Sequence, residues 1–221
     1  GSGSTLNFSG AVNVNGDSTV TGNAVSFGST VDGPNALTVN ASGATTFTGD
    51  IGANTALSSV TTDAAGTVAV QSGTVMTTGA QAFNDAVTLS VDTIFTGTDL
   101  SFGSLDGGVN VNLNGSGTTT LGATGSTTAL TTLTTDAAGS TTLNGSVTTT
   151  GDQTYGDDVA LGASITITAP NAGFQGLDIG GNTLTTNLAA SGTVVGAVNV
   201  NTGACVKDVA GSVSVTGQVT A

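Results

Sequence analysis

The chain of 221 residues contains 35 Gly and 14 acidic residues but only one basic residue, Lys207, and no His, giving a formal net charge of −13. A single cation cannot neutralise a phosphate backbone or an anionic lipid surface, so the composition excludes nucleic acid as a partner. The acidic residues are all Asp. Without Glu, His or Arg the usual general bases and anion clamps are missing, so we expect no enzymatic activity and no catalytic residues.

The rest of the composition favours an all-β fold. Thr, Gly, Ala and Val dominate; Thr and Val favour strands, whereas Gly, together with Asn and Asp, favours turns. Disorder is the alternative, but short alternating runs of Val, Leu, Ile and Phe and a mean hydropathy of +0.28 argue against it. No apolar run approaches the roughly 20 residues that span a bilayer, so we expect no membrane insertion.

In chain order, residues 1–4 are interpreted as a flexible start or tag remnant, and residues 5–221 as one continuous domain. Short strand-like runs follow, and the middle of the chain repeats itself at an offset of 72–73 residues. The aligned segments are 55–70 with 128–143, 75–89 with 147–161, and 102–106 with 174–178. A fixed period of this kind indicates a solenoid.

One super-repeat of about 73 residues is expected to contain about three rungs, such as 36–55, 56–78 and 79–108. Stacked rungs form a single-stranded parallel β-helix (β-solenoid) of roughly nine or ten rungs, because each inward apolar residue then has partners above and below. A β-sandwich is the main rival, since it also contains many short strands. The residues expected to face inward are Val39, Leu57, Val68, Val87, Leu89, Leu130, Leu143, Val159, Leu161 and Ile167.

The segment TTDAAG occurs twice, at 61–66 and 134–139, and is expected to form a corner between strands. In this hypothesis Asp63 and Asp136 accept hydrogen bonds from nearby backbone N–H groups as Asx turns, and a Gly then relaxes the backbone. Turn chemistry therefore accounts for the motif without a binding site.

The wording of the repeats resembles that of large bacterial surface proteins of the filamentous-haemagglutinin and autotransporter-passenger kind. The segments that carry this resemblance are TTFTGDIGANTALSSVTTDAAGTVAV at 45–70 and TTLNGSVTTTGDQTYGDDVALGA at 141–163. It covers the chain from about Leu6 to Ala221 and includes no catalytic motif. The resemblance implies a right-handed parallel β-helix on the outside of a bacterium, a stretch of adhesin shaft exported through an outer-membrane pore.

Metal ligands are scarce. Zinc lacks a ligand set because the chain has one Cys and no His. Calcium is the better candidate, and the densest acidic region contains Asp152, Asp157 and Asp158, but no calcium-loop motif accompanies them. Solvated turn carboxylates are therefore the main interpretation, and no cofactor is expected. Cys205 has no partner for an internal disulfide, and Lys207 is interpreted as a lone surface lysine rather than part of an isopeptide bond.

Two functions remain open at this stage. One is a non-enzymatic structural or adhesive segment of a cell-surface protein or extracellular fibre. The other is a module that binds ice or a host or surface carbohydrate through a flat Thr-rich face, suggested by TTT at 118–120 and 148–150. The regions 5–17 and 211–221 have ordinary rung sequence and no cap, so we expect copies or flanking rungs to stack end to end.

Overall fold

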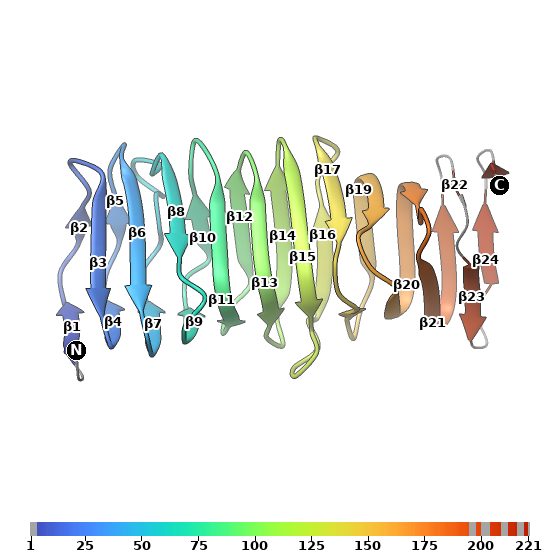
Figure 1. The fold of residues 1–221 in the computed structure, drawn as a ribbon, viewed down its shortest axis with the longest axis horizontal. Coiled ribbons are helices and arrows are strands. Elements are labelled where there is room, and N and C mark those ends of the chain that lie inside the picture. The colour runs from blue at the N-terminus through green and yellow to red at the C-terminus, as the bar shows by residue number, and fades with distance from the viewer. Residues whose placement is uncertain (1–3, 195–197, 200–203, 209–211, 216–218, 221) are drawn as a thin grey trace.

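The protein is a rod of parallel strands, with the two ends of the chain at opposite ends of the rod (Figure 1). The computed structural model describes residues 4–194, 198–199, 204–208, 212–215 and 219–220, and side chains up to residue 189. Every strand pairing in this part is parallel, from β1 with β4 to β22 with β25. The described residues form no helix, and hence no helical membrane span. The predicted all-β solenoid is therefore confirmed, and an antiparallel sandwich is excluded.

Each turn has three sides, and equivalent sides of successive turns stack into three faces. Face 1 contains β1 (Thr5–Phe8), β4 (Ala24–Phe27), β7 (Ala44–Phe47), β9 (Thr67–Val70), β18 (Val147–Thr148) and β23 (Ala204–Asp208). Face 2 contains β2 (Val12–Asn13), β5 (Val31–Asp32), β10 (Thr74–Met76), β12 (Thr93–Gly97), β14 (Asn110–Gly115), β16 (Thr132–Thr135) and β24 (Ser212–Val215). Face 3 contains β3 (Ser18–Gly22), β6 (Ala36–Ala41), β8 (Ser59–Thr62), β17 (Ser140–Leu143), β22 (Val198–Asn199) and β25 (Val219–Thr220).

Six longer strands bend around corners and contribute to more than one face. They are β11 (Gln81–Leu89), β13 (Leu100–Asp106), β15 (Thr118–Thr124), β19 (Gln153–Leu161), β20 (Ile165–Asp178) and β21 (Thr183–Val194). In β11 and β19 the register shifts at the bend, between Phe83 and Ala86 and between Tyr155 and Asp158. A local irregularity of this kind lets a strand turn a corner without ending.

The turns are more uniform and shorter than the expected rungs of 20 to 30 residues. Along face 2, ten successive pairings connect Val12 to Val215, and each pairing spans one turn. The shortest turn is 18 residues, from Phe95 to Leu113, and the longest is 24, from Ile51 to Val75. The expected rung 79–108 in fact holds β11, β12 and β13, which is more than one turn.

The super-repeat does not contain a whole number of turns, which corrects the expectation of about three rungs. Thr62 lies on face 3, where register pairings lead in three turns to Leu121. Its repeat counterpart Thr135 belongs to face 2, where it pairs with Leu113. Thr135 lies two sides beyond Leu121, so one super-repeat spans three turns and two sides, or 11 sides in total. Repeated residues therefore reappear on a neighbouring face of the rod.

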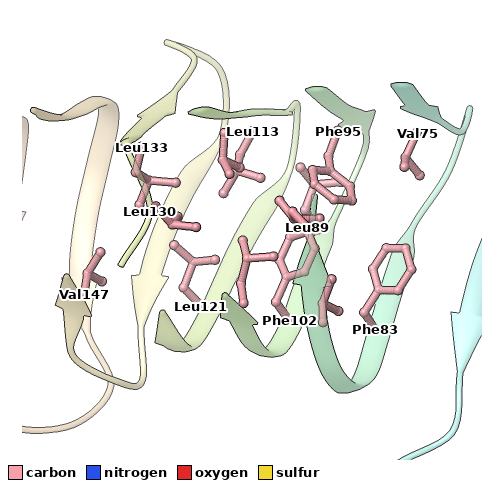
Figure 2. Close-up of a cluster of buried hydrophobic side chains, with 14 of the residues drawn as sticks. Val75, Phe83, Leu89, Phe95, Phe102, Leu113, Leu121, Leu130, Leu133 and Val147 are labelled. Atoms are coloured by element: carbon pink, nitrogen blue, oxygen red, sulfur yellow. The ribbon is translucent and has the colours of Figure 1, made fainter. Parts of the chain in front are cut away.

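The core is one column of side chains enclosed by the three faces, and Figure 2 shows its middle part. All ten residues predicted to face inward are buried, with exposed fractions from 0% for Val39 to 7% for Leu161. Aromatic rings stack along the rod axis: Phe27 lies between Phe8 and Phe47, with ring centroids 5.0 Å apart on each side. This spacing follows from the distance of about 4.8 Å between neighbouring strands, which brings rings in register into stacking contact.

The corner predicted for the TTDAAG segment is confirmed, but its hydrogen bonding is different. Residues 63–66 connect β8 to β9, and Gly66 has a φ of +116°. A Cβ at Gly66 would overlap the carbonyl oxygen of Gly43 in the preceding turn, so only Gly fits. The expected Asx turn is wrong: Asp63 Oδ1 accepts the N–H of Ala41 one turn earlier, at 3.0 Å. The carboxylate of Asp136 makes no hydrogen bond to the described residues.

Asp carboxylates connect neighbouring turns elsewhere as well. Asp17, Asp50 and Asp99 each accept a backbone N–H from the following turn, at 3.0, 3.1 and 2.8 Å. Such bonds satisfy N–H groups that the ladders leave unpaired at the corners. At Asp92, hydrogen bonds from the backbone and side chain of Asn110 hold the pKa of the carboxyl below its ordinary value.

Candidate functional site

The acidic region considered for calcium does not form one cluster. Asp157 faces the core and is 3% exposed, whereas its neighbour Asp158 is exposed on the outer surface. Asp152 is also exposed and accepts a hydrogen bond from Asn171 Nδ2 at 2.7 Å. Within the part of the chain that the structure describes, no group of three or more His, Cys, Asp or Glu side chains is placed to hold a metal ion.

Asp157 is bound inside the core by two threonine hydroxyls. Thr135 Oγ1 donates to Asp157 Oδ1 at 2.7 Å, and Thr141 Oγ1 lies 2.8 Å from Oδ2. Burial raises the pKa of Asp157; the two hydroxyls offset part of this increase, and the charge of Asp136 adds to it. The carboxyl therefore connects three strands from the inside and is not available to a ligand at the surface.

Asp85 is the repeat counterpart of Asp157, and it lacks these partners. It is 2% exposed, and neither carboxyl oxygen has a hydrogen-bond partner. Val68 stands where the second copy has Thr141. Burial raises the pKa of Asp85 and the charge of Asp63 adds to this, while Thr62 lies close enough to lower it in part. Thr62 Oγ1 nevertheless makes no hydrogen bond. The two repeat copies thus bury the same acid, but only the carboxyl of Asp157 is hydrogen-bonded.

In both repeat copies a buried glutamine makes hydrogen bonds at an inner corner of the rod. Gln81 and Gln153 each donate from Nε2 to a carbonyl oxygen in the following turn, at 2.9 and 3.1 Å. In the second copy Tyr155 donates its hydroxyl to Gln153 Oε1 at 3.0 Å. The first copy has Phe83 at this place, and Gln81 Oε1 is unpaired. These interior polar groups were not identified from the sequence.

The outer surface carries a polar groove of about 580 Å³ near the N-terminal end of the rod. It lies along the corner that follows face 3, and its lining includes Thr21, Asn23, Asn40, Ser42 and Asp63. No aromatic and no basic side chain contributes to it. The side chains of this lining offer hydrogen-bond donors and acceptors.

The two TTT runs that suggested a Thr-rich face do not share one face: Thr120 lies on face 3 and Thr148 on face 1. A short outward Thr ladder does occur on face 3. Thr19, Thr38 and Thr61 lie in register on successive turns. Ala82 and Ser101 occupy the next two positions, before Thr returns at 120 and 142. The regular array needed for a flat Thr lattice is therefore limited to three turns.

At both ends of the rod, strands pair on one side only within the described residues. β1, β2 and β3 pair with β4, β5 and β6, while β23 and β24 pair with β21, and β25 pairs with β22. Among the described strands, β1 and β23 lie on face 1, β2 and β24 on face 2, and β3 and β25 on face 3. Cys205 and Lys207 lie in β23, in register with Leu184 and Thr186, and their side chains lie outside the described part.

No protein-family model matches this chain, and comparisons with curated proteins and with solved structures give no match. The family suggested by the wording of the repeats is therefore not shown, and functional interpretation rests on the geometry of the rod.

Proposed function

We propose that the chain is a non-enzymatic structural segment of a bacterial cell-surface protein or extracellular fibre, and that its ends stack on further turns. The observation that carries this proposal is the parallel ladder on each face around one apolar core, with the outermost described strands paired on one side only. A second copy, or a flanking stretch of the same solenoid, can place β1 on β23, β2 on β24 and β3 on β25 without a rotational mismatch. Unpaired strand edges are templates for such pairing.

The interior supports a load-bearing role. Three continuous ladders run the length of the rod, and the core between them is closed by apolar and aromatic side chains. Corner carboxylates such as Asp17 and Asp99 add bonds between turns outside the ladders. Ten turns spaced by about 4.8 Å give a rod on the order of 50 Å. We therefore expect a stiff spacer rather than a flexible tether.

The location of the protein is part of the proposal. The resemblance of the repeats to bacterial surface proteins supports an extracellular position, and no disulfide is needed for the fold because each turn is stabilised by its neighbours. An antibody raised against the purified chain should label intact cells of the source bacterium. Labelling only after the cells are permeabilised would contradict a surface location.

End-to-end stacking is tested by blocking one open edge. Val12 and Val14 donate their N–H groups to Thr30 and Asp32 in the next turn. In a parallel ladder the N–H of the residue between them, Asn13, points to the opposite, open side. Asn13→Pro removes this donor while leaving the bonds to the next turn, whereas Asn13→Ala keeps it and serves as the matched control.

Sedimentation and negative-stain electron microscopy of the purified chain, at concentrations up to the millimolar range, provide the readout. We expect rods of constant width and growing length for the natural chain and for Asn13→Ala, and mostly single particles for Asn13→Pro. Far-UV circular dichroism confirms that both variants fold. Strictly monomeric natural chain at millimolar concentration would contradict stacking through open edges.

A binding module on face 3 is the second candidate, favoured by the register of Thr19, Thr38 and Thr61. An ice-recrystallisation assay tests it directly. Because the Thr ladder is interrupted after three turns, we expect no inhibition at micromolar concentrations. Clear inhibition, lost on Thr38→Ala, would favour this function over the spacer.

A further inference from the structure

A row of three polar side chains crosses the groove near the N-terminal end. Thr21 pairs in register with Asn40 on the next turn. One turn further on, Thr62 pairs with Val39, and Asp63 directly follows Thr62. The side chains of Thr21, Asn40 and Asp63 therefore lie on successive turns. All three line the groove. The side chains of Thr21 and Asn40 make no hydrogen bond to the described residues, and the same holds for one carboxylate oxygen of Asp63.

The same row occurs a second time, on face 2. Thr96 pairs in register with Asn114 on the next turn. One turn further on, Thr135 pairs with Leu113, and Asp136 directly follows Thr135. The local backbone is equivalent in both places: Asp63 N–H donates to Val39 O at 3.2 Å, and Asp136 N–H donates to Leu113 O at 3.2 Å.

The corner beside each row is also equivalent. Ser42 N–H donates to Gly22 O at 3.2 Å, and Ser116 N–H donates to Gly97 O at 3.1 Å. We call these Thr–Asn–Asp arrangements row 1 (Thr21, Asn40, Asp63) and row 2 (Thr96, Asn114, Asp136). Asp63 and Asp136 are counterparts in the super-repeat, so the arrangement recurs with it on another face. In both rows the Asn and Thr side chains contribute no hydrogen bond to the described part of the fold.

The chemistry of a row selects its ligand. A hydroxyl and a carboxamide both donate and accept hydrogen bonds, and a carboxylate only accepts, so the ligand must carry several groups that do both. Anionic ligands are disfavoured, because each row contains a carboxylate, the net charge is −13 and the chain has a single basic residue. A divalent cation is disfavoured as well, because each row supplies one carboxylate.

We propose that rows 1 and 2 are two related binding sites for a neutral polyhydroxylated ligand, that is, for units of an uncharged oligosaccharide. Hydroxyl groups of a sugar ring bridge the Asn carboxamide and the Asp carboxylate, which neighbouring strands hold about 4.8 Å apart. In row 1 the bond from Ala41 N–H to Asp63 Oδ1 fixes the carboxylate in place before binding. Row 1 lies two residues beyond the Thr ladder on β3 and β6, beside the corner that follows face 3. Neither row depends on end-to-end stacking.

The test uses the full chain on an array of immobilised glucans, galactans, mannans and polyuronates, followed by calorimetric titration with the best soluble oligosaccharide. Asn40→Ala and Asn114→Ala remove one side chain from each row without breaking an internal hydrogen bond. Asn112→Ala, two residues earlier on the same outer side of β14 and outside the row, is the matched control. Circular dichroism melting checks that every variant is folded.

We expect binding to neutral polysaccharides with two sites per chain, one site in each single variant, and at least a tenfold loss of affinity in the Asn40→Ala, Asn114→Ala double variant. Asn112→Ala should bind like the natural chain. The proposal is overturned if no neutral oligosaccharide binds at 10 mM, if the double variant binds normally, if polyuronates are preferred, or if a chelator abolishes binding. A stoichiometry of one would overturn the assignment of a binding site to each row.

Discussion

Replacing Val68 by Thr should stabilise the protein, although the same exchange in most cores is destabilising. Val68 is fully buried on β9 and stands where the second repeat copy has Thr141. Thr and Val have nearly the same shape, so Val68→Thr introduces a hydroxyl in the place from which Thr141 reaches Asp157 at 2.8 Å. The hydroxyl then faces the unpaired carboxyl of Asp85.

The magnitude follows from three contributions. Exchanging a buried methyl group for a hydroxyl loses about 1 kcal/mol of apolar burial. A new hydrogen bond contributes about 1 kcal/mol, and satisfying a buried acceptor that was unpaired removes a penalty of about 1–3 kcal/mol. The expected net gain in the free energy of unfolding is therefore about 1–3 kcal/mol.

The matched control is Val70→Thr, two residues along the same strand, where the buried side chain has no carboxyl beside it among its register partners Phe47 and Leu89. Here the added hydroxyl is buried without a partner, which should cost about 1–3 kcal/mol. Urea unfolding followed by circular dichroism compares both variants with the natural chain at pH 7. If Val68→Thr loses as much stability as Val70→Thr, the unpaired state of Asp85 is wrong.

Three further changes test other parts of the interior. Because burial raises the pKa of Asp85, the folded state binds a proton more tightly than the unfolded state, so the free energy of unfolding should fall as pH rises from about 4 through the raised pKa. Asp85→Asn should reduce this pH dependence and be more stable than the natural chain at pH 8. Urea unfolding measured at several pH values tests both expectations. Tyr155→Phe removes the donor to Gln153 Oε1 and should lower the free energy of unfolding by about 1–2 kcal/mol, whereas an unchanged urea midpoint would mean that the 3.0 Å bond contributes nothing. Gly66→Ala should strongly lower the melting temperature, because Gly66 has a φ of +116° and an added Cβ would overlap the preceding turn. Gly73→Ala is the control: its Cβ would meet its nearest neighbour at 3.6 Å, so this variant should melt like the natural chain.

Period-two alternation was enough to predict the core from the sequence. The alternation predicts that Val87 and Leu89 face inward because they share one side of a strand, and both are buried. The same parity places Asp85 on that inner side, and it places Asp157 inside with Val159. The sequence therefore contained the signal that these two acids are buried, but their charged type made surface turns the more natural interpretation.

Long-range register could not be read from the sequence. Asp63 was expected to bond locally, but its partner Ala41 lies one turn earlier. Turn lengths vary between 18 and 24 residues, so the residue above or below a given position is not at a fixed spacing. For the same reason the sequence predicts about three rungs in the super-repeat instead of three turns and two sides. It does not predict that three turns bring together the residues of row 1 or of row 2.

The 11-side super-repeat distributes its surface features helically around the rod. Each copy of a surface feature is rotated by one face from the copy before it, and three super-repeats, or 33 sides, are needed before a feature returns to its original face after 11 turns. That interval corresponds to about 53 Å along the axis. A longer shaft built from the same repeat would thus present identical features all around its circumference. It could contact neighbours in every direction, but a single flat surface would meet any given feature only once in about 53 Å.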